Sequence, residues 1–321
     1  MRLWILGGLI GALLGWGVGC DASSSDEENP SVEVVATTNV VGDLVEQIGG
    51  ESVSIESLMG PGVDPHLYRA SEGDVSRMNE ADIIVYNGLD LEGQMTNVLA
   101  RMGQQGRSTV ALAEEAVSED MLLESAEFEG NYDPHIWLDV ELWQRAAAHI
   151  ADVLAEHDPD HADVYQSNAE AYLDTLDELD AYVHERAAEV ADEQRVLITS
   201  HDAFRYFGEA YDFEVRGLQG ISTDVEAGTA DVRQLADFVA ERQIPALFVE
   251  TSVSQRGIEA VREAVRDRGF DVVIGGTLYG DALGSPGTEA GTYTGMVRHN
   301  IDTIVEGLSD EAVEAAERPA E

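Results

Sequence analysis

The sequence of 321 residues contains no lysine and only one cysteine, Cys20. All 18 basic residues are arginine, and 63 acidic residues bring the formal net charge to −45. A single cysteine excludes a disulfide within the chain and a metal cluster held by several thiolates. An acidic field of this strength repels nucleic acid, so a nucleic-acid partner is not expected.

The acidic residues are spread over the whole chain and include an acidic tail at 311–321. A strong negative field attracts cations and would act as a funnel for a metal ion if it were concentrated around a site. Because the excess is not localised, we favour adaptation of the surface to high salt, where such charge is largely screened. The net charge therefore indicates solubility in brine and not function.

The N-terminus indicates export from the cytoplasm. Residues 1–20 consist of Met1-Arg2, an apolar run from Leu3 to Val18, and small residues before Cys20, which is typical of a signal peptide. The run is shorter than the roughly 20 residues that a membrane-spanning helix needs. Gly17-Val18-Gly19-Cys20 resembles a bacterial lipobox, although Gly17 stands where leucine is usual.

The resemblance to a lipobox predicts that Cys20 is lipidated and becomes the mature N-terminus. Residues 21–31 have almost no apolar content and are predicted to be a flexible tether. We therefore expect an extracytoplasmic protein held at the cell membrane by its lipid, on the periplasmic face in a Gram-negative cell. Asp21 resembles the residue that retains such lipoproteins at the inner membrane.

Short β-branched runs alternate with longer amphipathic stretches on both sides of a central helical segment. Strands are predicted at 31–36, 52–58, 82–86, 108–112, 195–199, 213–217, 246–250 and 271–275. Helices are predicted at 40–48, 71–79, 92–102, 142–156, 203–211, 229–242, 255–268 and 292–307. This alternation predicts an α/β fold with parallel sheets, in which ligands bind beyond the carboxyl ends of the strands.

The segment from Pro159 to Gln194 contains no glycine and no further proline. Its apolar residues recur every three or four positions, at Tyr165, Ala169, Tyr172, Leu176, Leu179, Val183 and Ala187. This spacing predicts one helix of roughly 50 Å. We expect a linking helix at 158–194 between an N-terminal lobe at 32–157 and a C-terminal lobe at 195–310, with little opening or closing of the lobes.

Asp-Pro-His occurs twice, as Asp64-Pro65-His66 and Asp133-Pro134-His135. Proline fixes its own φ and restricts the residue before it, so the histidine that follows is presented on a stiffened loop. A metal ligand needs such presentation because coordination tolerates only small errors of placement. The alternative is that each tripeptide is simply a turn that ends in histidine.

Two further donors follow predicted strands of the C-terminal lobe. His201 comes just after the strand at 195–199, and Asp281 lies in a glycine-rich loop after the strand at 271–275. With His66 and His135, they place three imidazoles and one carboxylate on four strand-end loops, two from each lobe. This donor set suits one Zn²⁺ per chain, with metal–nitrogen distances of about 2.0–2.1 Å.

The chain from about 32 to 308 resembles the metal-binding solute receptors of bacterial zinc and manganese ABC transporters. The matching segments are Gly62–His66, Asp133–Asp139, Thr199–Phe207, Leu278–Gly284 and Gly291–Asn300. The resemblance implies two α/β lobes joined by a long helix, with His66, His135, His201 and Asp281 as ligands. It also implies a monomeric receptor that delivers its ion to a membrane permease driven by an ATPase.

The choice of metal is left between zinc and manganese. Manganese-selective members of the resembled family tend to carry glutamate at the position of His201, whereas zinc-selective members often carry a long histidine-rich loop that this chain lacks. Three nitrogen donors favour zinc by the Irving–Williams order, while Asp281, if it offered both oxygens, would suit manganese better. We expect zinc to bind more tightly, with manganese as the alternative.

The acids beside these donors are candidates for orienting the imidazole rings, although solvated loop acids are the favoured interpretation. They are Asp64, Asp133, Asp202 and Glu250. Three of the remaining histidines are predicted to be surface or packing residues: His149, His184 and His299. His157 and His161 are four residues apart and could resemble a second ion site, but Pro159 breaks the helical phase between them, so a ligand role is not favoured. Trp137 and Trp143 are predicted to lie in the core.

Two other classes of protein compete with a metal receptor. A zinc-dependent hydrolase needs an open coordination position and a general acid or base, yet the sequence has no His-Glu-x-x-His or Gly-x-Ser-x-Gly motif, and Asp281 fills the fourth position. A receptor for haem or an iron chelate would need a wide cleft instead of four converging small-ion donors. An enzyme is therefore not expected.

Overall fold

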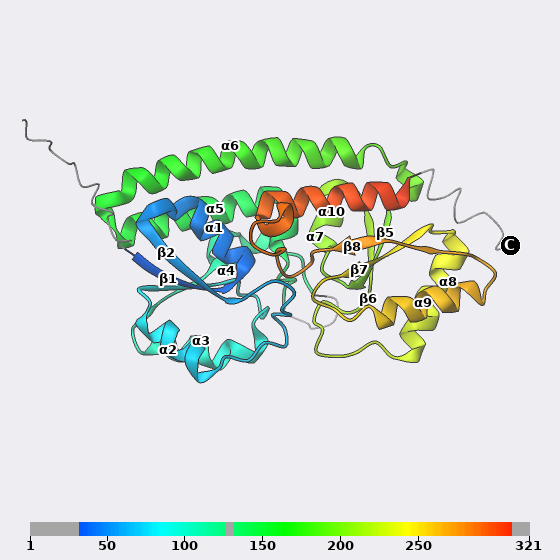
Figure 1. Cartoon of the computed structure of the whole chain (residues 1–321), viewed down its shortest axis with the longest axis horizontal. Helices are drawn as coiled ribbons and strands as arrows, with labels where there is room; N and C mark the ends of the chain where they lie inside the picture. Colours follow the sequence, from blue (N-terminus) through cyan, green and yellow to red (C-terminus); the bar gives the residue numbers. More distant parts are fainter. Residues whose placement is uncertain (1–31, 126–130, 310–321) are drawn as a thin grey trace, which may run out of the picture.

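The computed structural model describes residues 32–125 and 131–309, which form two lobes beneath one long helix (Figure 1). The predicted signal peptide, Cys20, the tether and the acidic tail lie outside the described residues. Within the described ranges, no helix combines the length and the apolar character that crossing a bilayer requires.

The N-terminal lobe contains one parallel sheet in the order β2-β1-β3-β4. Its strands are β1 (Val32–Thr38), β2 (Val53–Met59), β3 (Ile83–Tyr86) and β4 (Ser108–Ala111). Its helices are α1 (Asn39–Gly49), α2 (Glu72–Glu80), α3 (Thr96–Gln104), α4 (Leu112–Ala116) and α5 (Val140–His157). Helix α4 was not predicted, and its first residue, Leu112, was assigned to a strand.

The C-terminal lobe contains two parallel strand pairs, β5 with β6 and β7 with β8, and β5 also contacts β7. The strands are β5 (Val196–His201), β6 (Glu214–Gln219), β7 (Ala246–Glu250) and β8 (Val273–Leu278). The helices are α7 (Arg205–Tyr211), α8 (Thr229–Arg242), α9 (Arg256–Arg266) and α10 (Tyr293–Leu308). Every residue of β5 and β7 is buried, as expected of parallel strands that are covered on both faces. The predicted two-lobed α/β fold is confirmed.

The long helix α6 (Ala162–Ala187) runs along both lobes (Figure 1). Its inner face packs against α1 and α5 of the N-terminal lobe and α10 of the C-terminal lobe. All seven apolar residues predicted from their spacing are buried: Tyr165, Ala169, Tyr172, Leu176, Leu179, Val183 and Ala187. One continuous apolar stripe therefore joins the cores of the two lobes.

The predicted length of this helix was wrong. The α-helix ends at Ala187 instead of Gln194, so its 26 residues span about 39 Å and not 50 Å. Beyond its end the backbone turns, with the Val190 N–H donating to the Ala187 carbonyl at 3.1 Å. Val190 is buried, and its carbonyl accepts from Arg195 Nε at 2.9 Å. Burial of Val190 and the turn into β5 outweigh the local preference for helix.

Three of the C-terminal strands, β5, β6 and β8, end two or three residues later than predicted. His201 is the last residue of β5 and pairs with Gln219, so the parallel ladder fixes its backbone. The expectation that all four candidate ligands follow strands was wrong for His135. It precedes the short 3-10 helix Ile136–Leu138, which leads into α5. Sequence periodicity does not reveal a turn of this kind.

Replacing Leu176 by alanine should lower the free energy of unfolding by about 2–5 kcal/mol, because Leu176 is fully buried where α6 joins the two lobes. The matched control is Glu178→Ala, an exposed position on the same helix. Denaturant unfolding of the metal-free protein measures both changes. Equal losses for the two variants would contradict the role of the stripe.

Candidate metal site

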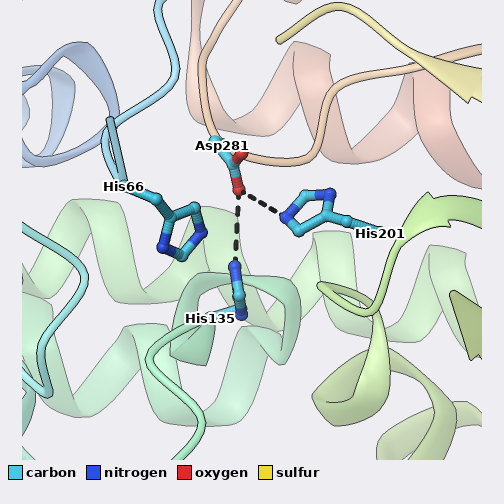
Figure 2. A group of neighbouring side chains, drawn as sticks. All are labelled: His66, His135, His201 and Asp281. Carbon is cyan, nitrogen blue, oxygen red and sulfur yellow. Dashed lines mark ion pairs between the residues drawn. The ribbon is translucent and has the colours of Figure 1, made fainter. Parts of the chain in front are cut away.

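Four buried side chains from four separate segments converge between the lobes (Figure 2). His66 lies in the loop after β2, and His135 lies at the start of the turn before α5. His201 ends β5, and Asp281 lies in the loop after β8. The structure thus brings together all four candidate ligands that the sequence predicted.

The donor atoms are close enough to share one ion. One nitrogen from each ring and one carboxylate oxygen all lie within 4.8 Å of one another. Asp281 Oδ1 is 3.4 Å from His135 Nε2 and 3.3 Å from His201 Nε2. Ligands about 2.0–2.1 Å from a tetrahedral zinc lie about 3.4 Å apart, so these contacts have the length of tetrahedral edges.

The donor atoms at the centre of this cluster lack partners. His66 Nε2, His135 Nε2, His201 Nε2 and Asp281 Oδ1 are buried and have no hydrogen-bond partner among the described residues. Burying an unpaired polar atom costs about 1–3 kcal/mol, and four such atoms facing one point are rare without a ligand. The chemistry of the donors, three imidazole nitrogens and one carboxylate oxygen, fits a divalent transition metal.

The two Asp-Pro-His segments form the same local turn. Asp64 Oδ1 accepts from the His66 backbone N–H at 2.9 Å, and Asp133 Oδ1 accepts from the His135 backbone N–H at 3.0 Å. Such a turn, in which an aspartate side chain bonds the backbone two residues on, fixes the direction of the histidine. The repeat is therefore a device for presenting an imidazole, as its sequence indicated.

Asp133 and Glu250 orient the rings of His135 and His201. For these two acids the prediction of a solvated loop position was wrong. Asp133 Oδ1 is 2.7 Å from His135 Nδ1, and Glu250 Oε2 is 2.8 Å from His201 Nδ1. Both carboxylates are almost completely buried. Each holds the ring with its other nitrogen, Nε2, toward the centre of the cluster, which is the usual support for a metal-binding histidine.

Asp64 and Asp202, the other two acids beside the ligands, are less buried and do not contact a ring nitrogen directly. Asp64 accepts through Oδ2 from Thr223 Oγ1 of the C-terminal lobe at 2.6 Å. Burial raises the pKa of Asp202 to about 6, and the Asp133 carboxylate adds to this effect. These two side chains lie at the margin of the cluster.

Contacts across the lobes hold the loops of His135 and Asp281 together. Trp137 Nε1 donates to the Gly280 carbonyl at 2.8 Å, directly before Asp281. Gly280 has no room for a side chain, because a Cβ there would lie 2.3 Å from Glu250 Oε2. Trp137 and Trp143 are 2% and 0% exposed, so their predicted place in the core is confirmed.

The carboxylates strongly affect the protonation of two of the rings. Burial lowers the pKa of His135, but Asp133 and Asp281 outweigh it and raise that pKa to about 9. Burial is likewise outweighed at His201, where Asp281 and Glu250 raise the pKa well above its usual value. Burial raises the pKa of Asp281, yet His201 and His135 hold it well below its usual range.

His66 differs from the other two histidines. Burial lowers its pKa to about 3, and the charge of Asp281 offsets only part of this effect. His66 is also the one member of the cluster that lines a cleft of about 650 Å³, together with Pro134, Asp202 and residues 217–222. A neutral imidazole therefore lies in the wall of this cleft.

The other histidines stay apart from this cluster. In the described part of the chain, it is the one group of three or more histidine, cysteine or acidic residues that is close enough to hold a metal ion. His161 Nδ1 contacts Asp158 at 2.7 Å, and His299 Nε2 contacts the Thr277 carbonyl at 3.0 Å. His157 and His161 belong to no such group among the described residues.

The fold and the cluster together define a class of protein: a two-lobed solute receptor with a buried site between its lobes that suits a small cation. The model of the family described as zinc-uptake complex component A, periplasmic, matches residues 34–307. The chain belongs to this family, whose members are solute-binding receptors for metal transport and not enzymes.

Individual relatives are similar over almost the whole chain. The manganese-binding lipoprotein MntA of Bacillus subtilis is 45% identical over 297 residues, which cover 92% of this chain and 95% of that protein. The zinc-binding protein TroA of Treponema pallidum is 47% identical over 277 residues, 86% of this chain and 88% of that protein. The solved structure of periplasmic TroA aligns with a TM-score of 0.84 and 45% identity, covering 87% and 99% of the two chains.

A manganese ABC transporter substrate-binding lipoprotein, PsaA of Streptococcus mitis, is 30% identical over 296 residues, 91% of this chain and 94% of that protein. The family inferred from the sequence is thereby confirmed. Neither alternative, the zinc-dependent hydrolase or the haem or iron-chelate receptor, finds support among these relatives.

Metal affinity should fall steeply as the pH drops below about 9. His135 has a raised pKa of about 9 and His201 a raised pKa, so each carries a proton below that pKa and must lose it to bind a metal. Each displaced proton should cost up to about tenfold in affinity per pH unit. Competition titrations across this range measure the slope, and calorimetry in buffers of different ionisation enthalpy counts the protons released. Affinity independent of pH would contradict these protonation states.

Proposed function

We propose that this protein is an extracytoplasmic receptor that captures one divalent transition metal at His66, His135, His201 and Asp281. The observation that carries the proposal is the convergence of four buried donor atoms that have no hydrogen-bond partner among the described residues. An ion at their centre would replace the missing hydrogen bonds with coordination bonds. Among the described residues, the contacts of Asp281 Oδ1 with His135 Nε2 and His201 Nε2 are the ones that offset the burial of these atoms.

Delivery to an ABC transporter follows from the family. PsaA is named as a substrate-binding lipoprotein of a manganese ABC transporter. We infer that this protein likewise passes its metal to a membrane permease driven by an ATPase, and that it acts as a monomer. The lobes at 32–157 and 195–310 would hold the ion between them, joined by the linking segment at 158–194.

Zinc is the favoured metal, with manganese as the alternative. Relatives of similar identity are named for each metal, so overall similarity does not decide between them. The donor set favours zinc, because three imidazoles and one oxygen match a tetrahedral zinc site and the Irving–Williams order places Zn²⁺ above Mn²⁺. We therefore propose one Zn²⁺ per chain as the tighter-bound cargo.

We also propose that residues 1–20 are a signal peptide and that lipid on Cys20 anchors the protein at the outer surface of the cell membrane. MntA and PsaA are both named as lipoproteins, which supports such an anchor. In a Gram-negative cell this surface faces the periplasm. The net charge of −45, spread along the chain, supports adaptation of this surface to high salt.

Replacing His66 or His201 by alanine should abolish tight binding of one zinc ion per chain, because each change removes one of four donors. The affinity should fall by at least about 100-fold, more than the loss caused by removing an outer partner of a ligand. Elemental analysis and competition with a chelator measure stoichiometry and affinity. His157→Ala, at an exposed histidine, is the matched control. Unchanged binding in both ligand variants would refute the site.

Replacing His201 by glutamate should narrow the preference for zinc over manganese, because a carboxylate oxygen suits Mn²⁺ better than an imidazole does. The new carboxylate would lie beside Glu250, so the change is best combined with Glu250→Gln, which removes the like charge at nearly constant shape. Glu250→Gln alone is the control. Zinc and manganese competition titrations measure the ratio of affinities, and an unchanged ratio in the double variant would argue against this role of His201.

A further inference from the structure

Thr251 and Ser252, the two residues that follow β7, lie beside the loop that carries Asp281. Strands β7 and β8 are parallel neighbours, with Glu250 paired to Leu278 at their ends. The pairing continues past the strand, since the Thr251 N–H donates to the Leu278 carbonyl at 3.1 Å. Ser252 is thus held at the edge of the site by the same ladder that positions Glu250.

The two oxygens of Asp281 have different surroundings. Oδ1 faces His135 Nε2 and His201 Nε2 and has no hydrogen-bond partner among the described residues. Oδ2 accepts a hydrogen bond from Ser252 Oγ at 3.0 Å. One oxygen therefore faces the centre of the cluster, while the other is held by a neutral hydroxyl.

We propose that Ser252 keeps Asp281 a ligand through one oxygen and thereby strengthens the preference for zinc over manganese. This inference rests on the proposed function of the same site. Three nitrogens and one oxygen complete the four-coordinate sphere that zinc favours. A second oxygen from Asp281 would raise the coordination number and the share of oxygen donors, both of which suit Mn²⁺. Ser252 is a positioning residue, because it acts through Asp281.

The Asp281 loop has enough other attachments to keep its place without Ser252. The Gly280 carbonyl accepts from Trp137 Nε1 at 2.8 Å, and the Leu283 N–H donates to Asn39 Oδ1 at 3.0 Å. Loss of the Ser252 hydroxyl should therefore free one carboxylate oxygen and not displace the loop. This separates an effect on the mode of coordination from a general loosening of the site.

The test compares Ser252→Ala with Ser252→Thr, which retains a hydroxyl, and with Ser254→Ala, an exposed serine two residues further on. Zinc and manganese competition titrations give the affinity ratio, and X-ray absorption of the bound metal gives the coordination number. In Ser252→Ala the ratio of the zinc affinity to the manganese affinity should fall by about tenfold. This value corresponds to one hydrogen bond of about 1.4 kcal/mol. The coordination number of bound zinc should rise from about four to about five. The other two variants should match the unsubstituted protein.

The outcomes separate this inference from the function on which it rests. If the unsubstituted protein binds neither metal, the proposed function itself fails. If that protein binds zinc but Ser252→Ala leaves both the ratio and the coordination number unchanged, Ser252 has no such role. A variant that loses affinity for both metals equally, at constant coordination number, would show that the serine only supports the loop. That result would also overturn the inference.

Discussion

The structure is organised around four donor atoms that are buried without hydrogen-bond partners among the described residues. Leaving such atoms unpaired costs free energy, so the surrounding residues must hold them in place against solvent and against one another. Two Asp-Pro-His turns direct His66 and His135, and two buried carboxylates hold the rings of His135 and His201. The cluster therefore has the geometry of a coordination sphere before an ion arrives, which limits the reorganisation that binding requires.

The contacts that support this cluster come from both lobes. The apolar stripe of α6 joins their cores, and the bond from Trp137 to the Gly280 carbonyl joins the loops that carry His135 and Asp281. Lobes that are joined in this way favour binding of an ion of fixed size over binding of a ligand around which the lobes must close widely. His66 also lines the cleft, so the site combines three donors that lie away from it with one that borders it.

The sequence predicted those features that depend on local spacing or on strand order. The apolar repeat of α6 identified its buried face, and the repeated tripeptide identified two histidines with the same turn. The roles of Asp133 and Glu250 were missed because they depend on burial, which arises only when distant segments pack together. The end of α6 was missed for the same reason, since burial of Val190 overrides a sequence that continues to favour helix.

All four donors take part in recognising a divalent cation. The choice between zinc and manganese depends on fewer atoms, namely the oxygen donors. Three imidazoles and a carboxylate would attract any divalent transition metal, and the Irving–Williams order would rank zinc above manganese at such a site. What the protein can vary is the number of oxygen donors and the ease with which they reach the ion. Because Glu250 ends β7 and Ser252 lies two residues further on, one short segment adjusts both His201 and Asp281. A change there would alter the coordination sphere while leaving the four ligands and the fold intact.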